Sequence, residues 1–432
     1  MRFRSVSPFP IVLFAVLVLT RCAAPSVVPP EPPAPAVTPA PENPHQTAAA
    51  LQGSFADGPA VTRACLSCHA EAGAELIRTA HWTWRGPTPG VEGHGDGASV
   101  GKINLVNNYC IAVPGNESRC AECHVGYGWV DGSFDFEDPG RADCLVCHDT
   151  TGTYRKAKSG GGLPAPGVDL GVVARGVGRT SVASCGACHF NGGGGDNVKL
   201  PNMGSRLLHA TPEMDVHMGG AGLACTDCHR AEGHRLAGSG SHLPVVEATL
   251  SCEACHAAPV HDDAELEGHT AHVACQACHI PSLGRLQPTK MTWRWSEAGD
   301  GARAAAPDKL GMPTYQKKKG AFSWAAGIRP TLAWDDGRSR RMVLGDTFEP
   351  GEGPVSLASP AATIHTPGAK LHPFKIMRGD QPADAVRHVL LPPHLFGDAA
   401  GPAPYWKAFD WAAALREGAA AAGIPYSGQF EF

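Results

Sequence analysis

The sequence is short of the material from which a protein core is usually built. Only 7% of its 432 residues are aromatic, whereas it contains 52 glycines and 38 prolines. Its charges nearly cancel, with 36 basic and 41 acidic residues, so net charge implies neither nucleic acid nor an anionic membrane surface as a partner. No Gly-x-Gly-x-x-Gly fingerprint follows a strand-like run, which argues against a nicotinamide site.

The N-terminal apolar run, Ile11 to Leu19, is too short for a comfortable transmembrane helix. It follows Arg2 and Arg4, so we expect residues 1–24 to be an export signal. Cys22 is a candidate for lipid attachment, and cleavage after Ala24 is the alternative. Residues 25–48 are rich in proline and are expected to form an extended tether. A tether favours a protein of the periplasm or cell surface that a lipid holds at the membrane.

Fourteen of the sixteen cysteines occur in seven copies of the pattern Cys-x-x-Cys-His. The copies are Cys65, Cys68 and His69; Cys120, Cys123 and His124; Cys144, Cys147 and His148; Cys185, Cys188 and His189; Cys225, Cys228 and His229; Cys252, Cys255 and His256; and Cys275, Cys278 and His279. Two thiols on one turn can add to the two vinyl groups of a porphyrin, while the adjacent His reaches the iron. The pattern predicts seven covalent haem c groups.

Two other uses of these cysteines are weaker. A zinc array also uses Cys and His, but here the His always follows the second Cys and no separate pairs complete a tetrahedral set. Disulfide bonds within each motif are a still weaker reading. Seven haems attached between residues 65 and 279 would themselves supply much of the core. We therefore expect a mainly α and irregular multihaem cytochrome c fold, wrapped around a packed haem cluster with little sheet. Its multihaem domain spans residues 49–279, and the haem-free segment 280–432 wraps the cluster.

Low-spin electron-transfer haems usually take a second His ligand, and fourteen histidines lie outside the motifs. His45 is set aside because it lies in the expected tether. The favoured candidates, beside haem motifs or in compact loops, are His81, His217, His234, His261, His269 and His365, with His394 as a further one. A surface or hydrogen-bonding role is the alternative for each. The number of histidines outside the motifs exceeds the six distal ligands that six haems with two His ligands require. The seventh haem can therefore have a different distal ligand without a shortage of histidine forcing it.

Several segments carry a more specific likeness, and some of them contain no haem cysteine. They include NNYCIAVPGNESRCAECHVGYGW, CLVCHDTTGTY, CGACHFNGGGGDNVK, KKKGAFSW, HPFKIMRGDQP and YWKAFDW. With these segments the chain from Asp57 onward resembles the octahaem tetrathionate reductase family of periplasmic c-type cytochromes. The resemblance implies that the second haem, on Cys120, Cys123 and His124, takes a Lys amine as distal ligand. The matching position is Lys199. The resemblance also places Cys110 and Asp196 in the active-site pocket.

The residues give these assignments physical support. A Lys binds iron only as the neutral amine, so burial and the metal must lower its pKa. Gly192 to Gly195 would let the backbone approach one porphyrin closely and carry Lys199 over its neighbour. The alternative is a flexible surface loop with a solvated Lys.

Three further features have open roles. Cys110 has no intramolecular disulfide partner, so it is either a buried inert thiol or a reactive one that attacks or contacts tetrathionate. Asp196 could bond the Lys amine or relay protons, and its alternative is a loop-turn role. The run Lys317 to Lys319 is either solvated or draws in an anionic substrate.

The chain departs from the family in one respect. Family members carry eight haems, whereas no Cys follows Cys278 here, so we expect the eighth haem site to be absent from this chain or truncated from it. The expected function is a periplasmic reductase whose haems with two His ligands pass electrons from a periplasmic or membrane donor to the Lys-ligated haem. The substrate would be tetrathionate or a small nitrogen oxyanion such as nitrite, with hydroxylamine also plausible. The alternatives are a non-catalytic electron conduit and hydroxylamine oxidation.

Overall fold

The computed structural model describes residues 43–88, 90–95, 98–106, 112–239, 246–248, 250–351, 353–397 and 403–432. Their contacts group them in one unit, Asn43–Phe432. The predicted export signal, Cys22 and Cys110 lie outside the described residues. Within the described residues, no helix is long and apolar enough to cross a membrane.

The folded unit begins at Asn43, within the segment that was expected to be a tether through residue 48. The short helix η1, Pro44–Gln46, starts there because the Asn43 side chain accepts a hydrogen bond from the His45 N–H and Pro44 occupies the first turn. The Asn43 amide also donates to the carbonyl of Val177 at 2.8 Å. A helix cap and a long-range hydrogen bond therefore fix a segment whose composition predicts an extended chain.

Short helices carry all seven haem motifs. Caps begin several of them: Asp57 accepts from the Ala60 N–H at the start of α1, and Ser181 and Ser184 form a reciprocal capping box at the start of α7. In the first, third, fifth and sixth motifs the His N–H bonds to the carbonyl of the first Cys at 2.8 to 3.1 Å, which closes one helical turn. The helices of this half are α1 Gly58–Leu66, α2 Ala70–Leu76, α3 Ala80–Thr83, α4 Glu117–Cys120, α5 Leu145–His148, α6 Leu170–Arg175, α7 Val182–His189, α8 Cys225–Cys228, α9 Ala264–His269 and α10 Cys275–His279, with the shorter turns η2 Ala49–Leu51, η3 Pro139–Arg141, η4 Ser205–His209, η5 Val216–Gly220 and η6 Cys252–Ala254.

The expectation of little sheet holds for the haem-motif half but not for residues 280–432. In its described residues the haem-motif half has only two- and three-residue strands: β1 Gly86–Pro87, β2 Val91–Glu92, β3 Ser99–Val100, β4 Ala231–Glu232, β5 Arg235–Leu236, β6 Gly238–Ser239 and β7 Val246–Ala248. The rest has β8 Thr289–Arg294, β9 Tyr315–Gln316, β10 Gly320–Ala325, β11 Thr331–Asp335, β12 Ser339–Arg341, β13 Ala358–Pro360, β14 Lys370–Phe374, β15 Arg378–Asp380, β16 Ala383–Asp384 and β17 Phe430–Glu431, together with η7 Trp295–Glu297, α11 Tyr405–Ala408 and α12 Trp411–Ala421. Aromatic and Thr residues in β8 and β10 favour extended backbone.

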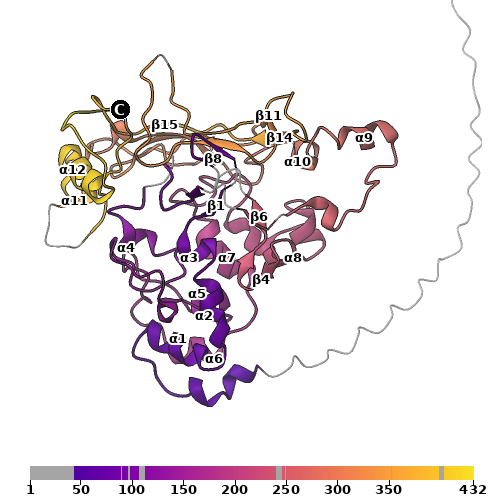
Figure 1. The fold of residues 1–432 in the computed structure, drawn as a ribbon, viewed down its shortest axis with the longest axis vertical. Coiled ribbons are helices and arrows are strands. Elements are labelled where there is room, and N and C mark those ends of the chain that lie inside the picture. The colour runs from indigo at the N-terminus through magenta and orange to yellow at the C-terminus, as the bar shows by residue number, and fades with distance from the viewer. Residues whose placement is uncertain are drawn as a thin grey trace, which may run out of the picture. The chain divides into compact units, whose positions relative to one another are not determined.

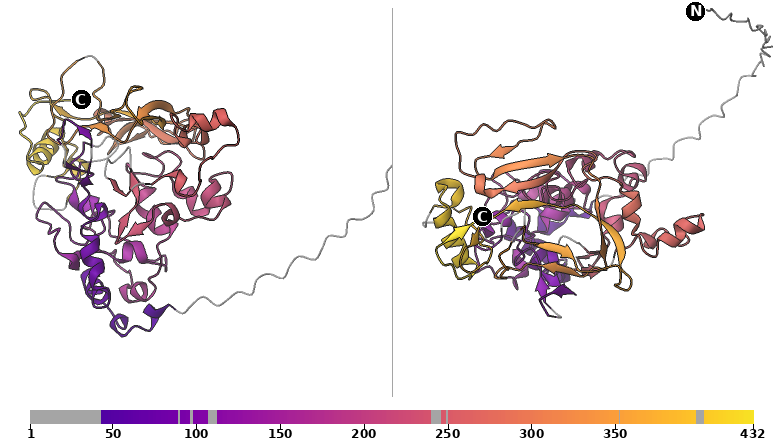
Figure 2. Two further views of the ribbon diagram at one scale, coloured as in Figure 1. Left: turned by 45° about the vertical axis from the view of Figure 1, so that its right-hand side comes forward. Right: turned by 90° about the horizontal axis from the view of Figure 1, so that it is seen from above.

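The longest strands form a sheet in the order β15-β8-β10-β9, and β11 pairs with β14 in a separate ribbon. Strands β8, β11, β14 and β15 lie along one side of the unit, and helices α1, α5 and α7 lie on the other (Figures 1 and 2). Strand β12 pairs in parallel with β2 of the haem-motif half. The Asn116 side chain, just before α4, donates to the carbonyl of Pro393 at 3.0 Å and accepts from the Leu395 N–H at 2.8 Å. The haem-free segment is thus joined directly to the second haem motif.

Candidate functional site

Four histidines outside the haem motifs each face a motif histidine at nearly the same separation. The ring centroids are 6.1 Å apart for His45 and His69, 6.1 Å for His81 and His189, 6.1 Å for His217 and His256, and 6.3 Å for His261 and His279. An imidazole nitrogen binds a transition metal at about 2 Å, so two imidazoles on opposite sides of one ion have centroids about 6 Å apart. All four pairs therefore have the spacing that one haem iron between them requires.

Three of the paired residues, His81, His217 and His261, were expected from the sequence as distal ligands. His45 was not, because its Pro-rich surroundings indicated a tether. The Asn-Pro dipeptide before it, a common helix start, was the signal that could have identified a folded segment.

Among the described residues, the structure does not bring the other three favoured candidates, or the further candidate His394, opposite a motif histidine. His234 pairs with Glu75, its Nδ1 lying 2.8 Å from the carboxylate. His269 ends α9, and the His365 backbone N–H donates to the Thr363 hydroxyl at 3.2 Å.

Backbone carbonyls lie within hydrogen-bond distance of three motif histidines. In His124 the contact is at Nε2, 2.6 Å from the carbonyl of Trp82, whereas in the other two it is at Nδ1. His148 Nδ1 lies 2.9 Å from the carbonyl of Gly178, and His229 Nδ1 lies 2.8 Å from the carbonyl of Ala237. A hydrogen bond at Nδ1 fixes the ring and leaves Nε2 available to a metal. The donor set of these motifs therefore fits a haem iron.

Thiols of different motifs contact one another. Cys65 hydrogen-bonds Cys144, Cys123 bonds Cys188, Cys185 bonds Cys225, and Cys252 bonds Cys275. These contacts join the first motif to the third, the second to the fourth, the fourth to the fifth and the sixth to the seventh. All fourteen motif cysteines are outside disulfides, and in the part of the chain that the structure describes no group of three or more His, Cys, Asp or Glu is placed to hold a bare metal ion. The motifs are thus arranged as a cluster of attachment points suited to haem c.

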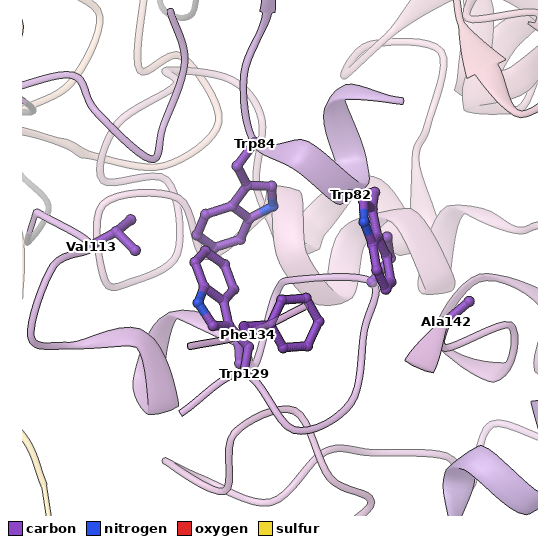
Figure 3. Packing of buried hydrophobic residues seen from close by; sticks show 8 residues of the cluster. Trp82, Trp84, Val113, Trp129, Phe134 and Ala142 are labelled. Carbon is purple, nitrogen blue, oxygen red and sulfur yellow. The ribbon is translucent and has the colours of Figure 1, made fainter. Parts of the chain in front are cut away.

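His124 of the second motif lies in a different environment from the other motif histidines. Its side chain is fully buried, whereas the other six are exposed or half-buried. The ring contacts Trp129 at 4.7 Å, Trp82 at 5.2 Å and Phe134 at 5.6 Å between centroids. Figure 3 shows Trp84, Trp129 and Phe134 gathered together, with Trp82 facing them from α3. Burial lowers the pKa of His124 to about 3, which keeps the imidazole in the neutral form that binds metals.

A buried ion pair holds the backbone of the second motif. The Lys156 ammonium lies 3.1 Å from the Asp143 carboxylate, and the two side chains are 3% and 0% exposed. Lys156 also donates to the carbonyls of Ala121, His124 and Gly126. The Asp143 carboxylate accepts from the hydroxyls of Tyr127 and Tyr154, both at 2.7 Å. Since Asp143 directly precedes Cys144, the pair couples the second motif to the third.

The glycine loop that leads to Lys199 contains two positions that require glycine. Gly193 and Gly194 have φ values of 81° and 84°, in the left-handed region. Beyond them the chain is clamped: the Asn197 amide donates to the carbonyl of Gln287 at 2.9 Å, and the Thr289 hydroxyl donates to the carbonyl of Asn197 at 2.8 Å. The Lys375 amine adds a bond of 2.8 Å to the carbonyl of Val198. The loop is therefore held by residues of the haem-free segment.

Lys199 itself is 7% exposed, which does not fit a solvated Lys on a flexible surface loop. Asp196 is placed differently from the expectation that it serves the Lys amine. Its carboxylate accepts from the Ser205 N–H at 2.8 Å and the Ser205 hydroxyl at 2.6 Å. Burial raises the pKa of Asp196, but the hydrogen bonds from Ser205 and Gln287 outweigh it and lower the pKa overall. These contacts give Asp196 the loop-turn role.

Three comparisons place the chain among known proteins. A family model described as "Cytochrome c bacterial" matches residues 290–432. The crystal structure of octahaem cytochrome c from Shewanella oneidensis is 36% identical in sequence, with a TM-score of 0.80 over 90% of this chain and 87% of that chain. An uncharacterised protein from Archaeoglobus fulgidus is 26% identical over 224 residues, which cover 40% of this chain and 74% of the relative.

Proposed function

Because the chain belongs to the octahaem cytochrome c family of multihaem c-type cytochromes, we propose that it is an exported reductase of small oxyanions. Its covalently bound haem c supplies one-electron transfer and, at the site of reduction, an iron whose sixth ligand can exchange. Tetrathionate is the substrate favoured by the segments shared with the tetrathionate reductase family, and nitrite and hydroxylamine are the other candidates. The site lies at the motif of Cys120, Cys123 and His124.

The observation that carries this proposal is the contrast between His124 and the four paired motif histidines. The aromatic rings that contact His124 in the described part of the chain belong to Trp and Phe, whereas His69, His189, His256 and His279 each face a second imidazole. The four pairs are proposed to be iron ligand pairs that serve electron transfer. The second motif is proposed to take the buried amine of Lys199 instead. The Cys188 thiol, at the start of the Lys199 loop, lies 3.9 Å from the carbonyl of Cys123.

The chain's own residues divide the work at this site. Lys156 holds the main chain of His124, and the Trp82 carbonyl holds the imidazole at Nε2, a contact that a bound iron would replace. Thr289 and Lys375 hold the backbone before Lys199, so the amine can leave its position while its main chain stays fixed. A displaced, protonated amine would then donate hydrogen bonds to an anion at the same place. Cys110, outside the described residues, is proposed to contact the substrate, and protons are proposed to come from the Lys199 amine and water.

The four histidine pairs also support a second candidate, a non-catalytic electron conduit. Steady-state assays on the purified holoprotein separate the two. Reduction of tetrathionate, nitrite and hydroxylamine by a reduced dye is measured for the wild type, Lys199→Ala and the exposed-residue control Lys309→Ala. We expect turnover of at least one substrate by the wild type and Lys309→Ala, and a changed kcat in Lys199→Ala alone. A protein that exchanges electrons with the dye but turns over none of them is a conduit.

A further inference from the structure

The haem-free segment brings two lysine amines to the Lys199 loop and buries a third close to one of them. The Lys319 amine donates to the carbonyl of Gly194 at 3.0 Å, and the Lys375 amine donates to the carbonyl of Val198 at 2.8 Å. Lys290, on β8, directly follows Thr289, which bonds the loop, and its amine shares the Trp293 ring with that of Lys319, at 4.7 Å and 5.9 Å from the ring centroid. Like charges gathered at a buried place repel one another, so this arrangement is unfavourable unless an anion balances it.

Of the three lysines, Lys290 is the one whose charge costs the most free energy to bury. Its side chain is 3% exposed, and its amine lies 3.5 Å from the ring centroid of Phe322, 4.7 Å from that of Trp293 and 5.0 Å from that of Trp324. These rings attract a cation and offset part of the cost of burying it. An ammonium also has three N–H donors, which rings satisfy poorly. In the part of the chain that the structure describes, the Lys290 amine forms no hydrogen bond or ion pair with a protein group.

Lys375 differs because its donors are already used. Its amine bonds the carbonyl of Val198, the hydroxyl of Thr289 at 2.6 Å and the carbonyl of Lys199 at 3.4 Å. Lys375 therefore positions the loop and contributes charge, whereas Lys290 has donors to offer a ligand.

We propose that Lys290 receives an anionic oxygen group beside the loop that leads to Lys199, with Lys319 and Lys375 adding attraction. The ligand chemistry is a small oxyanion or a carboxylate. It has two sources: the oxyanion substrate, which rests on the proposed function, or a propionate of a bound haem, which does not. In either case the haem-free segment supplies positive charge at the Lys199 loop.

The test uses the holoprotein and inorganic sulfate, an oxyanion that this chemistry does not reduce. Lys290→Met keeps the apolar stem and removes the charge, Lys290→Arg keeps the charge, and Lys309→Met is the exposed control. Sulfate affinity is measured by calorimetry, and the potential of each haem by redox titration. If a free oxyanion is the ligand, Lys290→Met weakens sulfate binding at least tenfold and Lys290→Arg restores part of it. If a propionate is the ligand, sulfate binding is unchanged and the potential of one haem shifts in Lys290→Met.

The proposal is overturned if Lys290→Met binds all of its haems and changes neither the sulfate affinity nor any potential. If Lys290→Met fails to take up haem, the same measurements on Lys319→Met test the proposal instead. The Lys319 amine lies at the loop and its side chain is less buried than that of Lys290, so this variant is expected to fold. Both readouts are independent of turnover. A protein that binds sulfate through Lys290 but reduces no oxyanion would refute the reductase and leave the anion site standing.

Discussion

His45 lies opposite His69 of the first haem motif, with ring centroids 6.1 Å apart and ring planes tilted by 34°. The two residues reach this position because Asn43 caps the turn that carries His45 and bonds the carbonyl of Val177. The end of the expected tether thus places a side chain opposite the histidine of the first haem motif.

Replacing His45 tests this relationship. We expect His45→Ala to remove one axial ligand, so the first haem changes from low spin to high spin or binds an added ligand such as cyanide. The measurement is the electron paramagnetic resonance spectrum of the oxidised protein. His94→Ala is the control, because His94 pairs with Asp346 at 2.9 Å, away from the motif histidines. An unchanged low-spin spectrum in His45→Ala would show that His69 takes its second ligand from elsewhere.

Thr289 holds the Lys199 loop from a fully buried position. Its hydroxyl donates to the carbonyl of Asn197 and accepts from the amine of Lys375. Thr289→Val removes both bonds and takes the donor from the buried Asn197 carbonyl, although Lys375 keeps its bond to Val198, so we expect a loss of about 1–3 kcal/mol in unfolding free energy. Urea unfolding measures it, and Thr331→Val, at an exposed position of β11, is the control. Equal stability of the two variants would contradict the clamp.

Lys156 and Lys158 form a matched pair for the second motif. Lys156 is buried against Asp143, whereas Lys158 is exposed. Removing one partner of a buried ion pair costs about 3–5 kcal/mol because the other charge stays buried, although two Tyr hydroxyls still bond Asp143 here. We therefore expect Lys156→Met to lose about 3 kcal/mol of unfolding free energy and Lys158→Met almost none. The prediction fails if both variants unfold at the wild-type urea concentration.

Stability should depend on pH through Lys290. Burial, together with the charges of Lys319 and Lys375, lowers the pKa of Lys290 to about 7, against about 10.4 in an unfolded chain. Between these two pKa values the unfolded chain binds more protons than the folded one. The contribution of Lys290 to the unfolding free energy therefore falls as pH decreases from about 10 to about 7 and is constant below that range. Lys290→Met removes this pH-dependent contribution. In low-anion buffer, the stability of the variant relative to wild type should rise as pH falls through that range, and a difference independent of pH would contradict the assignment.

The sequence predicted the haem attachment points well because Cys-x-x-Cys-His is a local pattern whose chemistry needs no tertiary information. His81, His217 and His261 were chosen from their local contexts, and the structure places each beside a motif histidine. His45 was missed because the composition around it outweighed the short cap signal at Asn43. The bonds of Thr289 and Lys375 to the Lys199 loop join residues about 90 and 177 positions apart, and no local pattern encodes such contacts. The same holds for the parallel pairing of β12 with β2.

The most direct test of the account is whether Lys199 ligates the haem of the second motif. Electron paramagnetic resonance spectra of oxidised wild type, Lys199→Ala and Lys309→Ala are compared after the haems are counted by mass. We predict that the signal of one haem changes in Lys199→Ala, while the signals of the paired-histidine haems and the whole spectrum of Lys309→Ala stay as in the wild type. Identical spectra for all three proteins would contradict the account and leave the electron conduit as the function.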